Sequence, residues 1–425
     1  MLESVQRETF EYFIANANPK NGLVADRTEP GAASSIAAVG LALSCYTVAV
    51  ERRLWSRQQA IAMTLATLRF FATSRQGEDP SATGHHGFYY HFLDMTSGAR
   101  APGVELSTID TGLLLAGMLS AAQYFSASTD DEPEIRELVE LIYRRVDWAF
   151  VAKPDGTLRH GWTPERGYLE WSWDFGYSEA LLLYVLALGS PTQTLPDAGY
   201  RAWTKTFERK QVYGIDYLYA GPLFIHQLPH VWLDLRGIRD DRAREVGFDY
   251  FENSRRATLV HRQYGIENPL CYDHYSEHGW GITASDGPGP AVKTYDGVER
   301  EFYSYLARGA PFGPDDGTLS PWAVVASLPF APEIVIPTIR HAIERLVARG
   351  HRGFGFDASF NPTFRDRLDS SHGWSSPWKL GLNEGPIILM IENCFSELVW
   401  NLMKASPHIV RGLRRAGFTG GWLDR

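Results

Sequence analysis

Residues 171–188 read WSWDFGYSEALLLYVLAL, an aromatic and acidic segment that runs directly into an apolar one. The apolar run predicts a helix over residues 176–189. Asp174 and Glu179 lie among two tryptophans, a phenylalanine and a tyrosine. Aromatic faces stack on sugar rings, and apolar surroundings raise the pKa of a carboxyl group toward the range that a general acid needs. The alternative interpretation is that acidic residues occupy a first helical turn because the helix dipole favours them there.

Helical periodicity recurs along the chain on both sides of this stretch. Apolar residues at i, i+3 and i+4 spacing predict about a dozen helices, at residues 2–17, 32–53, 57–74, 108–126, 132–150, 176–189, 198–206, 224–235, 240–264, 290–307, 319–326, 332–348 and 386–406. Connections rich in Gly, aromatic and acidic residues lie between alternate helices, at residues 22–27, 87–94, 155–162, 272–287 and 353–361. Long loops of this kind inside a compact domain are usually functional. Helical hairpins repeated about six times, with these loops on one side, predict an all-α fold: an α/α barrel, or toroid, that encloses a cleft and forms one domain over residues 1–425.

The composition argues against several classes of protein. The chain has 425 residues and a formal net charge of -9, with Lys and Arg scattered, so neither nucleic acid nor an anionic membrane is a predicted partner. Its three cysteines are far apart and odd in number, which fits neither a disulfide framework nor a metal knuckle. No apolar run reaches membrane-spanning length, and the first residues lack the pattern of a signal peptide. We therefore expect a soluble protein, periplasmic if a signal peptide was removed and cytoplasmic otherwise, and its oligomeric state stays open.

Several segments, taken together and in order, resemble one family. They are residues 25–28, 87–94, 105–111, 176–180, 186–192, 221–224, 226–227, 230–232, 249–257, 280–288, 316–321, 327–333 and 385–393. This pattern resembles the bacterial glucoamylase-like proteins, which include the endo-β-1,2-glucanases (sophorohydrolases). The resemblance implies an (α/α)6 barrel, hydrolysis of glycosidic bonds with inversion, and a β-1,2-glucan or its oligosaccharides as substrate. The family name does not imply activity on α-1,4 linkages.

One segment departs from the family pattern. Relatives tend to carry an Ile-Asp-Gln-Gly-Pro run where this chain has Leu382-Asn383-Glu384-Gly385-Pro386. An Asp is lost and a Glu follows one position later, so the identity of the general base is open.

Glycoside hydrolysis needs two carboxyl groups, one protonated beside the leaving oxygen and one that activates water or attacks the anomeric carbon. Glu179 is the predicted general acid because it matches the family's Gly-Tyr-Asn/Ser-Glu motif. A helix N-terminus would lower the pKa of its carboxyl group, whereas desolvation by the neighbouring aromatic residues would raise it. Desolvation must prevail if Glu179 is to donate a proton.

Two further residues are candidates for the second carboxylate. Asp110 follows Ser107 with the spacing of a capping box, so it either caps a helix or takes part in the site. Asn383 and Pro386 fit the N-cap and first position of a helix. That interpretation leaves Glu384 free to face the cleft, and the predicted catalytic set is therefore Glu179, Glu384 and Asp110.

The residues predicted to bind substrate are acidic, basic and aromatic side chains from the same segments: Arg27, Glu105, Trp171, Trp173, Asp174, Tyr177, His226, Trp280 and Asp286. Arg27 either holds a sugar hydroxyl or pairs with Asp26. Trp280 and Asp286 lie in a Gly-rich loop that fits a sugar platform as well as ordinary packing.

No cofactor and no metal ion are predicted. His226 and His230 have the i, i+4 spacing of a zinc pair, but Pro229 interrupts that helix and no metalloprotease Glu lies between them. The chain also lacks a G-x-S-x-G motif. The alternatives to a hydrolase are a glucan-binding or transglycosylating α/α-barrel protein and, least favoured because the net charge is acidic, a lyase.

Overall fold

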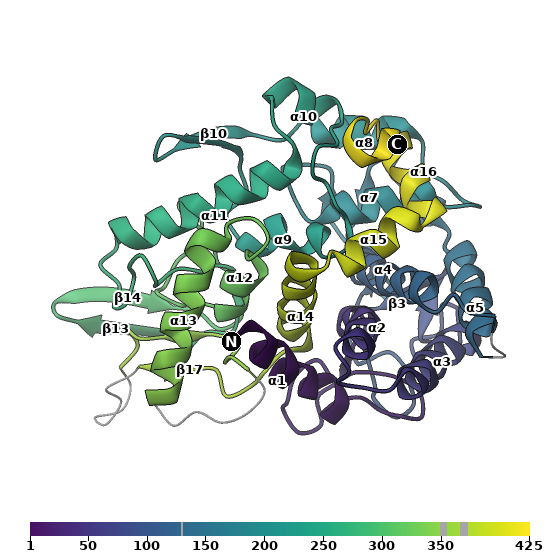
Figure 1. The fold of residues 1–425 in the computed structure, drawn as a ribbon, viewed down its shortest axis with the longest axis horizontal. Helices are drawn as coiled ribbons and strands as arrows, with labels where there is room; N and C mark the ends of the chain where they lie inside the picture. The colour runs from purple at the N-terminus through teal and green to yellow at the C-terminus, as the bar shows by residue number, and fades with distance from the viewer. Residues whose placement is uncertain (129–130, 349–354, 366–372) are drawn as a thin grey trace.

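The computed structural model describes residues 1–128, 131–348, 355–365 and 373–425 (Figure 1). Six helices form a central group: α2 (Ile36–Glu51), α4 (Thr108–Tyr124), α7 (Ala180–Gly189), α9 (Leu223–Trp232), α12 (Pro321–Ala326) and α14 (Gly381–Phe395). Each contacts the next in that order, and α14 contacts α2, so the contacts form a closed cycle. Most residues of these helices are buried and apolar, as expected of helices enclosed by others. In α7, for example, every residue is buried.

The tightest approach in this cycle is between α2 and α4, and glycine permits it. A Cβ atom added to Gly117 would lie 1.9 Å from the carbonyl oxygen of Gly40. The two backbones therefore touch at a point where no side chain fits.

A second layer of helices packs outside the central group. α1 (Leu2–Ala15) contacts α14, α3 (Arg57–Thr73) contacts α2, α5 (Glu132–Arg145) contacts α4, α16 (Pro407–Arg415) contacts α7, α11 (Tyr250–Glu267) contacts α9, and α13 (Pro332–Ala348) contacts α12. Each inner helix thus has an outer partner, and the first and last α-helices of the chain both belong to the outer layer. The remaining helices are α6 (Trp148–Val151), α8 (Asp197–Thr204), α10 (Asp241–Val246), α15 (Leu398–Ala405) and the short 3-10 helix η1 (Gly421–Asp424).

Short antiparallel strands fill the loops that lead into the inner helices. A five-stranded sheet joins β2 (Gly84–His85), β3 (Phe88–Tyr90), β5 (Leu106–Ser107), β7 (Gly161–Thr163) and β8 (Gly167–Tyr168). Smaller pairs are β1 (Ser34–Ser35) with β4 (Phe92–Leu93), β6 (Leu158–Arg159) with β9 (Ser172–Trp173), β12 (Ala284–Ser285) with β15 (Leu306–Ala307), and β16 (Phe360–Asn361) with β17 (Trp374–Ser375). An isolated bridge between Arg27 and Leu380 also links the loops before α2 and α14. These pairings bring the segments before the inner helices together at the N-terminal ends of those helices.

Most of the predicted helices are present, but the all-α class is incomplete. Residues 290–307 were predicted to be a helix and instead form the hairpin of β13 (Ala291–Tyr295) and β14 (Val298–Phe302), followed by β15. Its turn is Asp296-Gly297, both with positive φ (53° and 79°), which is the geometry that joins two strands tightly. A second hairpin joins β10 (Arg209–Val212) to β11 (Ile215–Leu218), and both hairpins project from the body of the molecule (Figure 1).

Helix boundaries differ from the prediction at three places. Residues 240–264 form two helices because Gly247, with a φ of 89°, ends α10 in the left-handed conformation. Residues 132–150 divide into α5 and α6, and the predicted helix 386–406 divides into α14 and α15. α14 begins five residues early, at Gly381, so Asn383 lies inside its first turn and the predicted N-cap is wrong. The predicted loop 353–361 begins outside the described residues, and α16 was not predicted.

Within the described ranges, no helix combines the length and the hydrophobicity that crossing a membrane requires.

Candidate active site

Glu179 lies immediately before α7, as the residue that caps its N-terminus, and it is partly exposed. Burial by the surrounding side chains raises the pKa of its carboxyl group to about 7, and the charge of Asp110 raises it further. A hydrogen bond with the backbone acts in the opposite direction. The effect of desolvation on the pKa of Glu179 therefore outweighs that of the helix N-terminus, and Glu179 keeps its proton at mildly acidic pH.

Asp110 lies in the first turn of α4 and does two things at once. The Ser107 hydroxyl accepts a hydrogen bond from the Asp110 backbone N–H (3.2 Å) and donates one to the Asp110 carboxylate, so the predicted cap is present. The other carboxylate oxygen, Oδ1, lies 3.6 Å from Nε2 of His91. Asp110 thus caps its helix and also brings a negative charge close enough to affect Glu179.

His91, which the sequence did not mark as a site residue, lies between two of the acids. Its Nδ1 is 2.8 Å from Oε1 of Glu105, and its ring stacks on Phe92 at a centroid distance of 3.9 Å. Burial alone would lower the pKa of His91, but the charge of Asp110 and the hydrogen bond and charge of Glu105 raise it to about 9. His91 is therefore an imidazolium at neutral pH.

A second ionic group adjoins the first. Arg27 Nε donates to Asp26 Oδ2 at 3.0 Å, and its NH1 lies 3.8 Å from Oδ1 of Asp286. Tyr305 is 51% exposed, but desolvation around its hydroxyl group raises the pKa of that group to about 12, and the charges of Asp26, Asp286 and Asp110 add to the effect. Tyr305 was missed because its segment was predicted to be a helix. Both expectations for Arg27 remain open, since it pairs with Asp26 and also reaches Asp286.

The aromatic residues before Glu179 divide into exposed and buried ones. Trp171 and Phe175 are 73% and 71% exposed, which is unusual for large apolar side chains. Trp173 is buried: its indole N–H donates to Thr108 Oγ1 at 3.0 Å and its ring stacks on His160 at 3.7 Å. Tyr177 is also buried and stacks on Tyr250.

Asp174, between Trp173 and Phe175, forms an ion pair with Lys153 at 2.5 Å. Trp171 and Phe175 are therefore the two residues of segment 171–177 whose aromatic faces are exposed.

Glu384 shares a neighbour with the Arg27 group, because its charge and the charge of Asp26 both act on the hydroxyl group of Tyr12. Glu384 is 1% exposed, in the first turn of α14, and its charge acts on Tyr12 of the outer helix α1. Burial raises the pKa of its carboxyl group to about 8, although Lys379 opposes the shift. Its Oε2 atom has no hydrogen-bond partner among the described residues. The expectation that Glu384 faces the cleft stays a prediction, although α14 begins earlier than predicted and Glu384 lies in its first turn.

Two predicted substrate-binding residues belong to the packed interior. His226 has no exposed surface, its Nε2 lies 3.2 Å from the carbonyl oxygen of Ala220, and burial lowers its pKa to about 4. Trp280 is 2% exposed and donates from its indole N–H to Thr338 Oγ1 at 3.2 Å. Both side chains stabilise the core and have no surface to offer a substrate.

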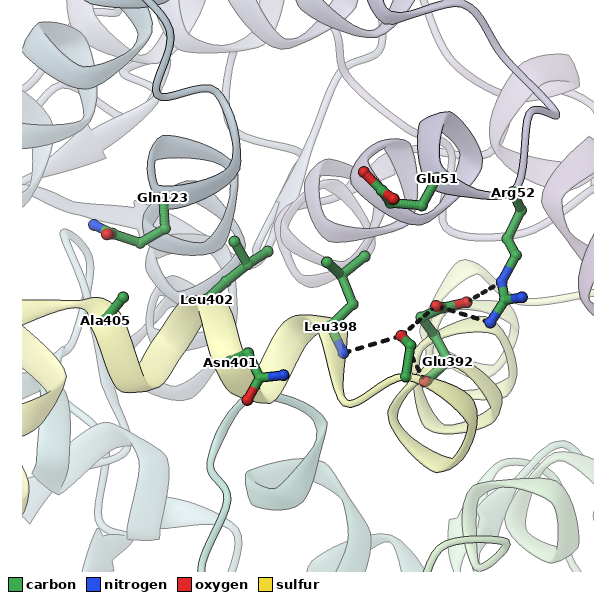
Figure 2. A pocket seen from close by; sticks show the side chains of 9 residues that line it. Glu51, Arg52, Gln123, Glu392, Leu398, Asn401, Leu402 and Ala405 are labelled. Atoms are coloured by element: carbon green, nitrogen blue, oxygen red, sulfur yellow. Dashed lines mark hydrogen bonds and ion pairs between the residues drawn. The ribbon is translucent and has the colours of Figure 1, made fainter. Parts of the chain in front are cut away.

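Two surface pockets lie at different places on the molecule. One, of about 670 Å³, includes Arg27 and is lined by residues 15–18, 25, 27–33, 94–96 and 100–102. The other, of about 420 Å³, lies at the C-terminal ends of α2, α4 and α14, where Arg52 pairs with Glu392 at 2.7 Å (Figure 2). None of the acids Glu179, Asp110, Glu105, Asp26 and Asp286 lines either pocket. Within the described part of the chain, no group of three or more His, Cys, Asp or Glu side chains is placed to hold a metal ion.

Comparison with known proteins gives consistent matches. The model of the glycoamylase family, described as "Putative glucoamylase", matches residues 170–407, more than half of the chain. A crystal structure of a "putative glucoamylase" from Bacteroides uniformis is 30% identical, covers 100% of this chain and 98% of its own, and superposes with a TM-score of 0.86.

Two matches come from Parabacteroides distasonis. An exo β-1,2-glucooligosaccharide sophorohydrolase (non-reducing end) is 27% identical over 98% of this chain, which spans 57% of that relative's length. The crystal structure of a β-1,2-glucanase is 25% identical over 98% of this chain and 59% of its own, with a TM-score of 0.83.

Proposed function

The chain belongs to the glycoamylase family, and from this premise we propose that it is a glycoside hydrolase that cleaves β-1,2-linked glucan or its oligosaccharides by acid–base catalysis. The observation that carries the proposal is the acid pair: Glu179 has a pKa of about 7 and feels the charge of Asp110. The closed cycle of helix contacts supports an (α/α)6 barrel in a single domain over residues 1–425, with this acid pair in its cleft.

The reaction assigns one proton transfer to each carboxyl group. Glu179 donates its proton to the glycosidic oxygen as the bond from that oxygen to the anomeric carbon breaks. Asp110 takes a proton from a water molecule whose oxygen forms the new bond to the same carbon. A carboxyl group with a pKa near 7 holds the proton needed for the first step, and an ionised Asp110 accepts the proton of the second.

Asp110 is a better candidate for the base than Glu384. A general base must be ionised and must reach the reacting water. Glu384 is buried against α1, and its pKa of about 8 keeps it protonated at neutral pH. Asp110 is paired with a cationic His91, and its charge reaches Glu179.

The surroundings of the acid pair suit a polyhydroxylated substrate. Trp171 and Phe175 offer exposed aromatic faces for sugar rings, in the segment that ends at Glu179. Arg27, Asp26 and Asp286 supply charged donors and acceptors for hydroxyl groups, and the 670 Å³ pocket beside Arg27 has the volume of a typical ligand site.

A panel of glucans tests the proposed substrate. Linear β-1,2-glucan is expected to give sophoro-oligosaccharides, whereas β-1,3-, β-1,4- and α-1,4-glucans are expected to give none. Mass spectrometry in ¹⁸O-water should find one heavy oxygen in each new reducing end, because water is the acceptor in hydrolysis. Turnover of a different glucan, with no product from the β-1,2-linked one, would contradict the proposal. Products longer than the starting chain and free of ¹⁸O would instead indicate transglycosylation.

A further inference from the structure

Four carboxylates form two ionic groups near Glu179: Asp110 and Glu105 around His91, and Asp26 and Asp286 around Arg27. Of these acids, Asp110 is the one whose charge acts on Glu179. Among the described ion pairs, those of Arg27 are with Asp26 and Asp286, and none is with Asp110 or Glu105. Around Asp110 and Glu105, the cation is His91, which both carboxylates contact. Without it, the charge of Arg100, which acts on Glu105 and is itself paired with Glu165, would be left to offset these carboxylates.

His91 is held so that both ring nitrogens face a carboxylate. Nδ1 donates to Glu105 at 2.8 Å, and Nε2 lies at ion-pair distance, 3.6 Å, from Asp110. Its backbone is fixed on both sides, since its N–H donates to the Glu105 carbonyl (3.0 Å) and its carbonyl accepts from the Ile36 N–H (3.2 Å). With one ring nitrogen hydrogen-bonded to a carboxylate and the other at ion-pair distance from a second carboxylate, the arrangement favours the doubly protonated ring.

We propose that His91 is a positioning residue for the reaction: its imidazolium, bridging Glu105 and Asp110, fixes the Asp110 carboxylate and keeps it ionised for its role as base. The inference rests on the proposed function, because it assigns His91 a task in that same site. His91 itself exchanges no proton with the substrate.

Loss of the His91 imidazolium should shift the pH dependence of activity in one direction. A cation close to a carboxylate favours the ionised form of that carboxylate, so a variant without the imidazolium is expected to need a higher pH for full activity. The base must be ionised, and activity therefore disappears at a higher pH as the solution is acidified. The groups that face His91 are Glu105 from the segment before β5, Asp110 from α4 and Asp26 from the segment before β1. All three are acidic, so none replaces the lost positive charge.

The experiment compares His91→Asn with a matched control, His86→Asn. His86 is also a carboxylate-paired, stacked histidine, 3.0 Å from Asp147 and stacked on Phe150, but it pairs with none of the acids around Glu179. Its positive φ of 50° also suits asparagine. For both variants, kcat and KM on linear β-1,2-glucan are measured from pH 4 to pH 9.

His91→Asn is expected to move the acidic limb of the kcat profile up by about one pH unit, with KM changed less than about twofold. On the acidic side of the profile its kcat should fall by up to about tenfold, the most that a shift of one pH unit produces, and at the top of the profile by much less. His86→Asn should leave the profile in place. An unshifted acidic limb, or an equal loss of kcat at every pH, would overturn the proposal, because a merely structural role lowers activity without moving the limb.

A measurement on the unaltered protein covers the case in which His91→Asn does not fold. In ¹⁵N spectra of the histidine rings, we expect one ring to stay doubly protonated up to a pH near 9. If every histidine ring carries only one N–H proton at pH 8, the proposal fails. Turnover of β-1,2-glucan by the unaltered enzyme is a separate result, so failure of this inference and failure of the proposed function are distinguishable.

Discussion

Replacing Glu179 by Gln is expected to lower kcat on linear β-1,2-glucan by roughly 10²–10⁴-fold, because the amide cannot protonate the leaving oxygen. A loss of about 10³-fold corresponds to about 4 kcal/mol of transition-state stabilisation. KM should change little, since the variant keeps the shape of the side chain. The exposed Glu170, nine residues earlier in the chain, gives a control: Glu170→Gln should retain full activity.

The role of Glu179 as an acid, and not only as a charge, can be isolated with a second substrate. An aryl β-sophoroside whose phenol has a low pKa needs no protonation to leave. Glu179→Gln should therefore recover most of its activity on that substrate. For the unaltered enzyme on glucan, kcat/KM should fall as the pH rises through about 7, where Glu179 loses its proton, and the variant should lack this alkaline limb. Equal losses on both substrates would contradict the assignment.

Replacing Asp110 by Asn is expected to lower kcat by a similar factor, roughly 10²–10⁴-fold, on the glucan and on the aryl sophoroside alike. Both substrates need an activated water, and an amide cannot take its proton. Because the amide side chain still has an oxygen to which Ser107 can donate, the start of α4 should keep its cap, and the unfolding temperature should stay close to that of the parent.

Glu384→Gln is the matched comparison for this second prediction. Glu384 is 1% exposed in the first turn of α14, and if Asp110 is the base, the activity of Glu384→Gln should remain within a few-fold of the parent. A large loss of kcat in Glu384→Gln, with a smaller one in Asp110→Asn, would exchange the two assignments.

The sequence carried enough information for the local features around Glu179. Aromatic neighbours and an apolar helix predict a desolvated carboxyl group, and the structure gives Glu179 the raised pKa that this environment implies. Capping by Ser107 was also readable from spacing alone. The Asp296-Gly297 dipeptide contained a hairpin signal that helical periodicity obscured, so that error was avoidable.

Other features depend on contacts between distant segments. α14 begins at Gly381 because the Gly381 N–H donates to the carbonyl oxygen of Asp26, and no local pattern reports a hydrogen bond over that separation. His91 and Tyr305 join the acids only because the loops before the inner helices pair with one another, and a single sequence does not state which loops pair.

The central claim is that Glu179 and Asp110 act as the acid and base of an inverting β-1,2-glucan hydrolase, and proton NMR of the reaction in its first minutes tests it most directly. An inverting hydrolase releases the product with the opposite anomeric configuration, because water attacks the face opposite the departing oxygen. With linear β-1,2-glucan, the account predicts that α-anomeric reducing-end signals appear first and that the β-anomer grows in later by mutarotation. A β-anomer that appears first would show a retaining mechanism and contradict the role given to Asp110.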